Sequence, residues 1–180
     1  MKNTFKLSLS LLANQFLASI GGFMCVIFVF LLARDSIYAH IIFMIFTYPF
    51  FIYIEYRSAF NYGFHDPDRR NNPKSKKYLY KGAISGLISG IPLIALIVLY
   101  IFSSNAGNLF WSETARLYTR IIAMYYNWPM CNMFPNHTLE VFLSSLIGII
   151  IFPMIGYIAG YKNFVISDKI YCMLKIKPMK

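Results

Sequence analysis

Four long stretches without Asp, Glu, Lys or Arg dominate this chain of 180 residues. They cover residues 7–33, 36–54, 82–112 and 141–161, and each holds at least 19 residues. A helix needs roughly 20 apolar residues to cross the hydrocarbon core of a bilayer. Four such runs leave little chain for a separate soluble domain. The sequence therefore predicts an all-α polytopic membrane protein that forms a single membrane domain over residues 1–180.

The charged residues between the runs set the expected boundaries. We predict four transmembrane helices, an inner basic loop and an outer loop. The helices are expected at about 7–33, 36–56, 82–102 and 139–161, the inner loop at 57–81 and the outer loop at 103–138. A short basic tail follows the last helix.

The distribution of basic residues predicts the orientation. With four spans, the N-terminus, the inner loop and the tail share one side of the membrane. That side carries 14 Lys and Arg residues and the other side carries 3. Because cytoplasmic loops are enriched in Lys and Arg, we expect a multi-pass protein of the cell membrane with both termini in the cytoplasm.

The composition excludes some partners. Only 13% of the residues are charged, against about 25% in an ordinary globular domain. The net charge of +10 could indicate nucleic-acid binding. Basic residues that flank membrane spans and meet anionic lipid headgroups explain it better, so we expect no nucleic-acid partner.

A cleaved signal peptide is the alternative for the first apolar run. Lys2 and Lys6 would supply its basic start. The apolar run, however, continues to Ala33, well beyond the roughly 7–15 residues of a signal-peptide core. We therefore predict a retained helix.

Small residues recur at four-residue steps in the last two spans. Gly82, Gly86 and Gly90 have this spacing, and so do Gly148, Gly156 and Gly160, with Phe152 between them. Small residues on one helix face let a second backbone approach closely. We predict packing contacts at Gly86, Gly90, Gly156 and Gly160, either within the chain or between subunits.

Few polar side chains fall inside the predicted spans. Asn14, Gln15 and Ser19 lie in the first, and we interpret them as contacts to other helices. His40 is the only ionisable residue well inside a charge-free run. An ionisable residue in a membrane is a functional candidate by default, but a neutral, hydrogen-bonded histidine near the outer interface is the simpler interpretation. The sequence places no acidic residue at mid-membrane.

The inner loop combines basic residues with a His-Asp-Pro-Asp segment. Arg69, Arg70, Lys74, Lys76 and Lys77 are predicted to bind anionic lipid headgroups. His65, Asp66 and Asp68 could ligate a metal, but their spacing matches no established site, and Pro67 more simply indicates a turn. We therefore expect no metal and no cofactor.

The outer loop predicts one more helix. It would open at Ser112 and Glu113 and run to Asn127, before Pro129. Apolar residues such as Leu117 lie on one face and charged residues on another, which is typical of a helix lying in the membrane interface. The tail, over about 167–177, could form a short basic amphipathic helix on the inner face.

Residues 62–90 carry a family resemblance. An aromatic-Gly-aromatic stretch precedes Asp66, a basic linker follows, and a Gly- and Ser-rich segment then opens a helix. This pattern, with the Gly-Tyr-Lys-Asn ending at 160–163, resembles small four-helix integral membrane proteins of Firmicutes. His65 departs from the pattern, which has a basic residue there. The resemblance implies a bacterial cytoplasmic membrane and carries no activity.

Three classes of function fit these observations. The first is a non-enzymatic membrane subunit or accessory protein that acts through helix–helix contacts with a membrane-protein partner or a second copy. The second is a small oligomeric transporter or pore, which prolines at 49, 92 and 153 would suit. The third is a lipid-active enzyme that uses His65, Asp66 and Asp68 at the inner interface. The many Gly and Ser residues of the spans and the absence of charges at mid-membrane favour the first, non-enzymatic class, and the enzyme class needs more paired polar residues than the sequence offers.

Overall fold

A computed structural model describes residues 2–33, 36–66, 78–162 and 164 of the chain. Every regular element in the described part is a helix, which confirms the predicted all-α fold. The elements are α1 (Lys2–Ala33), α2 (Ile37–Phe64), α4 (Tyr78–Ser89), α5 (Ile91–Asn105), α6 (Leu109–Ile122), α7 (Met124–Met133), the short 3-10 helix η1 (Pro135–His137) and α8 (Thr138–Tyr161). The predicted tail helix lies outside the described residues.

Three segments of the described chain are long and apolar enough to cross a membrane. They are Thr4–Cys25, Ile37–Phe64 and Pro135–Tyr161. The third predicted span is not one straight helix. It is divided into α4 and α5, which are bent by 57° relative to each other and which together would make a fourth span.

The bend lies where Gly90 separates the two helices and Pro92 follows. Proline has no N–H to donate to the carbonyl of Ile88, and its ring clashes with the preceding turn. The surrounding bonds persist, because Gly90 N–H donates to the Gly86 carbonyl at 2.9 Å and Ile94 N–H donates to the Gly90 carbonyl at 2.9 Å. The chain therefore changes direction here without losing helical bonding on either side.

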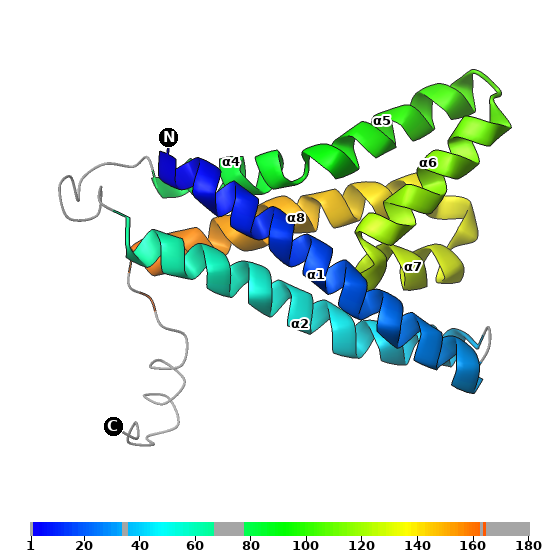
Figure 1. The fold of residues 1–180 in the computed structure, drawn as a ribbon, viewed down its shortest axis with the longest axis horizontal. Helices are drawn as coiled ribbons and strands as arrows, with labels where there is room; N and C mark the ends of the chain where they lie inside the picture. Colours follow the sequence, from blue (N-terminus) through cyan, green and yellow to red (C-terminus); the bar gives the residue numbers. More distant parts are fainter. Residues whose placement is uncertain (1, 34–35, 67–77, 163, 165–180) are drawn as a thin grey trace.

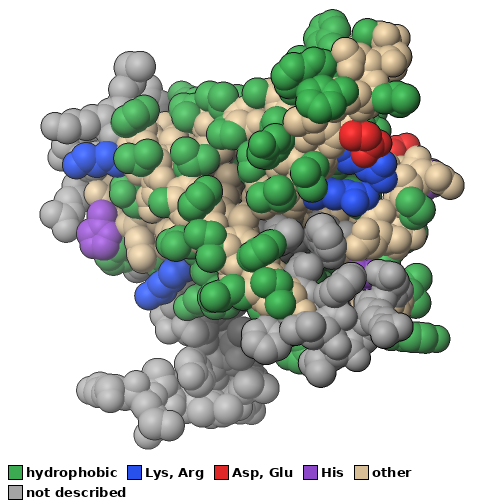
Figure 2. Space-filling model, turned by 45° about the vertical axis from the view of Figure 1, so that its right-hand side comes forward, with side chains coloured by type: hydrophobic (Ala, Val, Ile, Leu, Met, Phe, Trp, Pro, Cys, Tyr) green, Lys and Arg blue, Asp and Glu red, His purple; other side chains and the backbone are tan. Residues whose placement is uncertain are grey.

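The long helices α1, α2 and α8 run beside one another, and α4 joins them at the end that holds the N-terminus (Figure 1). The helix α5 diverges from this bundle, and α6 folds back beside α5 after a turn in which Gly107 adopts a φ of 67°. In Figure 2, hydrophobic side chains cover the middle of the displayed face, and charged side chains lie towards its two sides. This distribution suits a protein surrounded by lipid.

The predicted packing glycines lie in contacts within the chain. A Cβ atom added to Gly86 would lie 2.6 Å from the carbonyl oxygen of Ile149 in α8. One added to Gly156 would lie 2.5 Å from the carbonyl oxygen of Tyr56 in α2. These positions admit no side chain unless the neighbouring backbone moves.

The other two predicted packing glycines are Gly160 and Gly90. A Cβ atom at Gly160 would collide with the carbonyl oxygen of Phe60 in α2. At Gly90 the nearest atom is the flexible Cδ1 of Leu146, at 3.1 Å, so this contact is looser than the others. The helix α8 thus packs its backbone against both α2 and α4.

The register of α2 and α8 fixes their relative direction. Gly156 lies opposite Tyr56, and Gly160 lies opposite Phe60. Residue numbers rise together along this contact, so the two helices run in the same direction. The chain between them must therefore return to the far end of the bundle before α8 begins.

The segment predicted as the outer loop differs from the single interfacial helix predicted to run to Asn127. It breaks at Ala123 into α6 and α7, and α7 packs against α1 and α2. Asn127 has no exposed surface and donates from Nδ2 to the Thr119 carbonyl at 3.1 Å. The same carbonyl also accepts from the Ala123 N–H at 3.4 Å, and the Asn127 bond connects α6 to α7 at the break.

Candidate functional site

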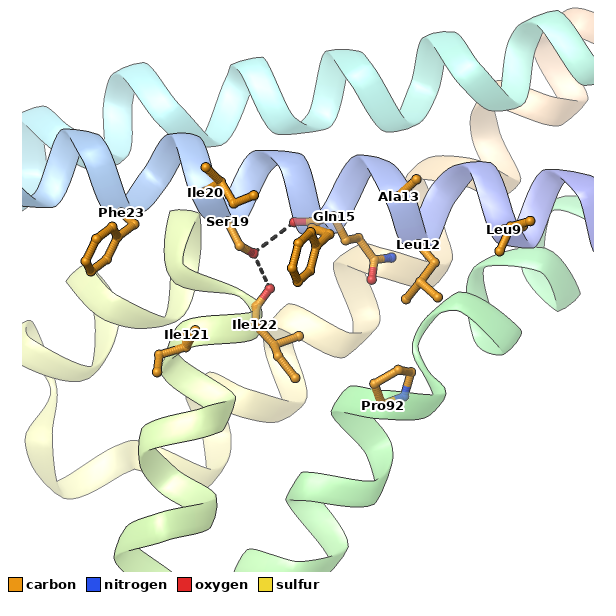
Figure 3. A pocket seen from close by; sticks show the side chains of 11 residues that line it. Leu9, Leu12, Ala13, Gln15, Ser19, Ile20, Phe23, Pro92, Ile121 and Ile122 are labelled. Carbon is orange, nitrogen blue, oxygen red and sulfur yellow. Dashed lines mark hydrogen bonds between the residues drawn. The ribbon is translucent and has the colours of Figure 1, made fainter.

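An elongated groove of about 640 Å³ lies along α1, beside the bend between α4 and α5 (Figure 3). Its walls come from α1, from the start of α5 and from the end of α6. The lining residues are Leu9, Leu12, Ala13, Gln15, Phe16, Ser19, Ile20, Phe23, Pro92, Ile121 and Ile122. All but Gln15 and Ser19 are apolar.

The local sequence explains why the groove exists. The helix α4 packs against α1, but the bend before Pro92 turns α5 away from it. The space beside α1 then stays open until α6 reaches back. There, Ser19 Oγ donates a hydrogen bond to the carbonyl oxygen of Ile122, the last residue of α6.

The two polar residues of the groove, Gln15 and Ser19, form hydrogen bonds to neighbouring helices. Gln15 is 3% exposed and donates from Nε2 to Ser89 Oγ of α4 at 3.1 Å. Ser89 in turn donates to the Gly86 carbonyl at 2.8 Å. On the α2 side of α1, Asn14 Nδ2 donates to Ser58 Oγ at 2.8 Å. The polar residues of the first span thus contact other helices, as the sequence indicated.

A buried ion pair connects three helices at the end of the bundle that holds the N-terminus. Asp66 follows α2, and its side chain is 2% exposed. Lys81 Nζ of α4 lies 2.7 Å from Asp66 Oδ2, and the Tyr157 hydroxyl of α8 donates to the same oxygen. Asp66 therefore holds the end of α2 to α4 and α8.

The predicted His-Asp-Pro-Asp segment does not assemble into a site within the described residues. His65 is exposed, and its Nδ1 lies 2.8 Å from the Asn61 carbonyl oxygen rather than at a carboxylate. Asp68 lies outside the described residues. In the part of the chain that the structure describes, no group of three or more His, Cys, Asp and Glu side chains could hold a metal ion.

Glu55 is a buried residue that the sequence did not single out. It is the first charged residue after the second apolar run and lies near the end of the span predicted at 36–56. The helix α2 continues to Phe64, and Glu55 has no exposed surface inside the bundle. Neither of its carboxylate oxygens has a hydrogen-bond partner in the described structure. Glu55 is therefore a buried acidic side chain within the span predicted at 36–56, and the sequence predicted no role for it.

Helix periodicity was the signal that could have located Glu55. Residues four apart share a helix face, and Phe51 and Ala59 are both buried, at 1% and 0% exposure. Glu55 lies midway between them. By contrast, Arg57 lies on another face and is exposed.

The residues predicted to bind lipid headgroups lie outside the described residues. They are Arg69, Arg70, Lys74, Lys76 and Lys77.

No protein-family model, no curated protein and no solved structure matches the chain. The resemblance to Firmicutes membrane proteins therefore stays a prediction, and the function proposed below rests on the geometry of the groove.

Proposed function

We propose that this chain is a non-enzymatic protein of the bacterial cytoplasmic membrane that holds an acyl chain of a membrane lipid in the α1 groove. The observation that carries the proposal is the groove itself, which is almost wholly apolar and includes outward-facing side chains. Phe16 is 70% exposed and Phe23 is 53% exposed. In a bilayer such side chains meet lipid.

The proposal includes four membrane crossings with both termini in the cytoplasm. Its support is the common direction of α2 and α8. If both helices cross the membrane in the same direction, the chain between them has to cross back once, and α4 with α5 is the available apolar segment. The 14-to-3 division of basic residues supports the cytoplasmic placement of both termini.

The dimensions of the groove suit an acyl chain. Along α1 it extends from Leu9 to Phe23, which is about 21 Å at 1.5 Å per residue. One leaflet of the hydrocarbon core is roughly 15 Å deep, so the groove is long enough for an acyl chain that spans one leaflet. Lys6 is exposed one turn before Leu9, where its ammonium group could pair with the phosphate of the same lipid.

The side chains of the groove favour a lipid over a partner helix. Close helix–helix contacts in membranes use small residues, and the groove presents Leu9, Leu12, Phe16 and Phe23. Gly86 and Gly156 already pack within the chain. The glycine spacing, which was compatible with packing within the chain or between subunits, is thus accounted for by internal packing.

The arrangement at the inner end supports a non-enzymatic role. A His–Asp pair could move protons in a reaction, but Asp66 pairs with Lys81 and Tyr157 rather than with His65. The headgroup role of the five basic residues in the 67–77 segment remains a prediction of the same proposal.

Filling the groove should remove the lipid. In Figure 3, Leu12 points towards Pro92 across the groove. We expect Leu12→Trp to occupy this space and to lower the amount of phospholipid retained after mild-detergent purification by about one molecule per protein. Native mass spectrometry measures this directly.

A matched control separates this effect from a general loss of lipid. Ile45 on α2 is 60% exposed and does not line the groove, so Ile45→Trp should retain as much lipid as the unmodified protein. Equal lipid retention by Leu12→Trp and Ile45→Trp would contradict the proposed function.

A further inference from the structure

Glu55 has no structural role that the described contacts account for. Its carboxylate is fully buried, and neither oxygen accepts a hydrogen bond in the described structure. Burying an ionised carboxylate without a partner is very costly, so such a group takes up a proton instead. Acidic residues in membrane spans are rare and usually mark a functional pathway.

The packing of α2 locates Glu55 relative to the other helices. On one side of it, Ala59 clusters with Leu11 of α1. On the other side, Phe51 clusters with Ala18 of α1. Glu55 of α2 therefore lies beside the part of α1 between Leu11 and Ala18.

This part of the bundle contains the half-buried amide of Asn14 and the buried amide of Gln15. Asn14 reaches Ser58 of α2, and Gln15 reaches Ser89 of α4. On α8, Gly156 packs against Tyr56, the residue that follows Glu55. Glu55 thus belongs to a layer that combines one carboxyl group with amides and hydroxyls from three helices.

The other charged and titratable groups at this end of the helices are not partners of Glu55. Lys6 of α1, Arg57 of α2 and Lys162 after α8 are exposed. Lys81 of α4 pairs with Asp66, and Tyr157 of α8 donates to the same carboxylate. Tyr161 of α8 is buried beside Leu7 and Leu11. None of these groups forms a hydrogen bond to Glu55.

We propose that Glu55 is a proton-binding site within the membrane domain, a role that goes beyond lipid binding. In the arrangement described, in which Glu55 is fully buried, the carboxyl group is protonated and neutral. When the inner end of the bundle admits water, the O–H bond breaks, the proton passes to water, and the carboxylate that remains is hydrated. Return of a proton from water restores the buried, neutral carboxyl group.

Infrared spectroscopy of the full-length protein in phospholipid vesicles tests this proposal. At neutral pH we expect a carbonyl stretching band of a protonated carboxylic acid. This band should be absent from Glu55→Gln and retained in Glu140→Gln, because Glu140 is exposed. Absence of the band from the unmodified protein, or its retention in Glu55→Gln, would overturn the proposal.

Exchange with water is tested on the same sample. Raising the pH should abolish the Glu55 band reversibly while the helical content stays constant. If the band persists at every pH at which the protein stays folded, then Glu55 does not exchange its proton with water and the proposal is wrong. Loss of the band on adding sodium or potassium ions at constant pH would assign the site to a metal cation and would also overturn the proposal.

The stability of the variants separates a proton site from a structural one. Glutamine has the shape of a protonated glutamate, so Glu55→Gln should fold with the same helical content and the same midpoint of thermal unfolding as the unmodified protein. Failure of Glu55→Gln to fold would show that the carboxyl group has an essential structural partner, which is the result that contradicts a site kept for proton binding.

Discussion

Replacing Gly86 with leucine should strongly destabilise the folded bundle. A Cβ atom at this position would lie 2.6 Å from the Ile149 carbonyl oxygen and 3.0 Å from the Ile150 Cα atom. Both atoms belong to the backbone of α8, so they can move away only if the helix moves. We expect a loss of about 3 kcal/mol or more in the free energy of unfolding, at the upper end of the cost of overpacking.

The measurement is denaturant unfolding in detergent micelles, followed by circular dichroism. Gly21 provides the control, because a Cβ atom added there meets nothing within 4 Å. Gly21→Leu should therefore unfold at nearly the same denaturant concentration as the unmodified protein. If Gly86→Leu proves as stable as Gly21→Leu, then α4 and α8 do not pack as described.

Lys81→Ala should also cause a large loss in the free energy of unfolding. The Asp66 side chain is 2% exposed and lies 2.7 Å from the Lys81 ammonium group. Removing one partner of a buried ion pair leaves a buried charge without compensation, which costs about 3–5 kcal/mol. The Tyr157 hydroxyl still donates to Asp66, so we expect about 3 kcal/mol, towards the lower end of this range.

The same unfolding assay tests the ion pair. The more exposed pair of half-buried Arg116 and exposed Glu113, at 3.2 Å, is the control, and Arg116→Ala should cost at most about 1 kcal/mol. Replacing both buried partners, as in Lys81→Met with Asp66→Asn, should recover most of the stability, because the uncompensated charge is then gone. Equal losses for Lys81→Ala and Arg116→Ala would show that Asp66 is not buried in this contact.

The features that the sequence predicted well are those set by composition and spacing. Long apolar runs predict helices long enough to cross a bilayer, whatever those helices pack against. Small residues four apart predict a face that another backbone can approach, and Gly86, Gly156 and Gly160 lie in such contacts. What the spacing could not provide was the identity of the partner, which is α8 for Gly86 and α2 for the other two.

The features that were missed depend on where a helix bends or ends. Pro92 was visible in the sequence, but the direction of the 57° bend before it depends on how α4 and α5 pack, and that bend opens the groove. The break at Ala123 requires Asn127 to reach the Thr119 carbonyl, a contact that no periodicity predicts. Glu55 follows the charge-free run 36–54 directly, but α2 continues to Phe64 and buries it, which the length of a charge-free run does not predict.

The proposed function requires a chain that crosses the membrane four times with both termini in the cytoplasm. Single-cysteine labelling tests this topology, in a background from which Cys25, Cys131 and Cys172 have been removed. Cysteines are introduced at Lys6, at Ala106 in the exposed turn between α5 and α6, and at Lys162. In intact cells, a membrane-impermeant thiol reagent should label only Ala106→Cys, and the other two should react after the membrane is opened. Labelling of Lys162→Cys but not of Lys6→Cys in intact cells would place the termini on opposite sides and would contradict the four-crossing topology.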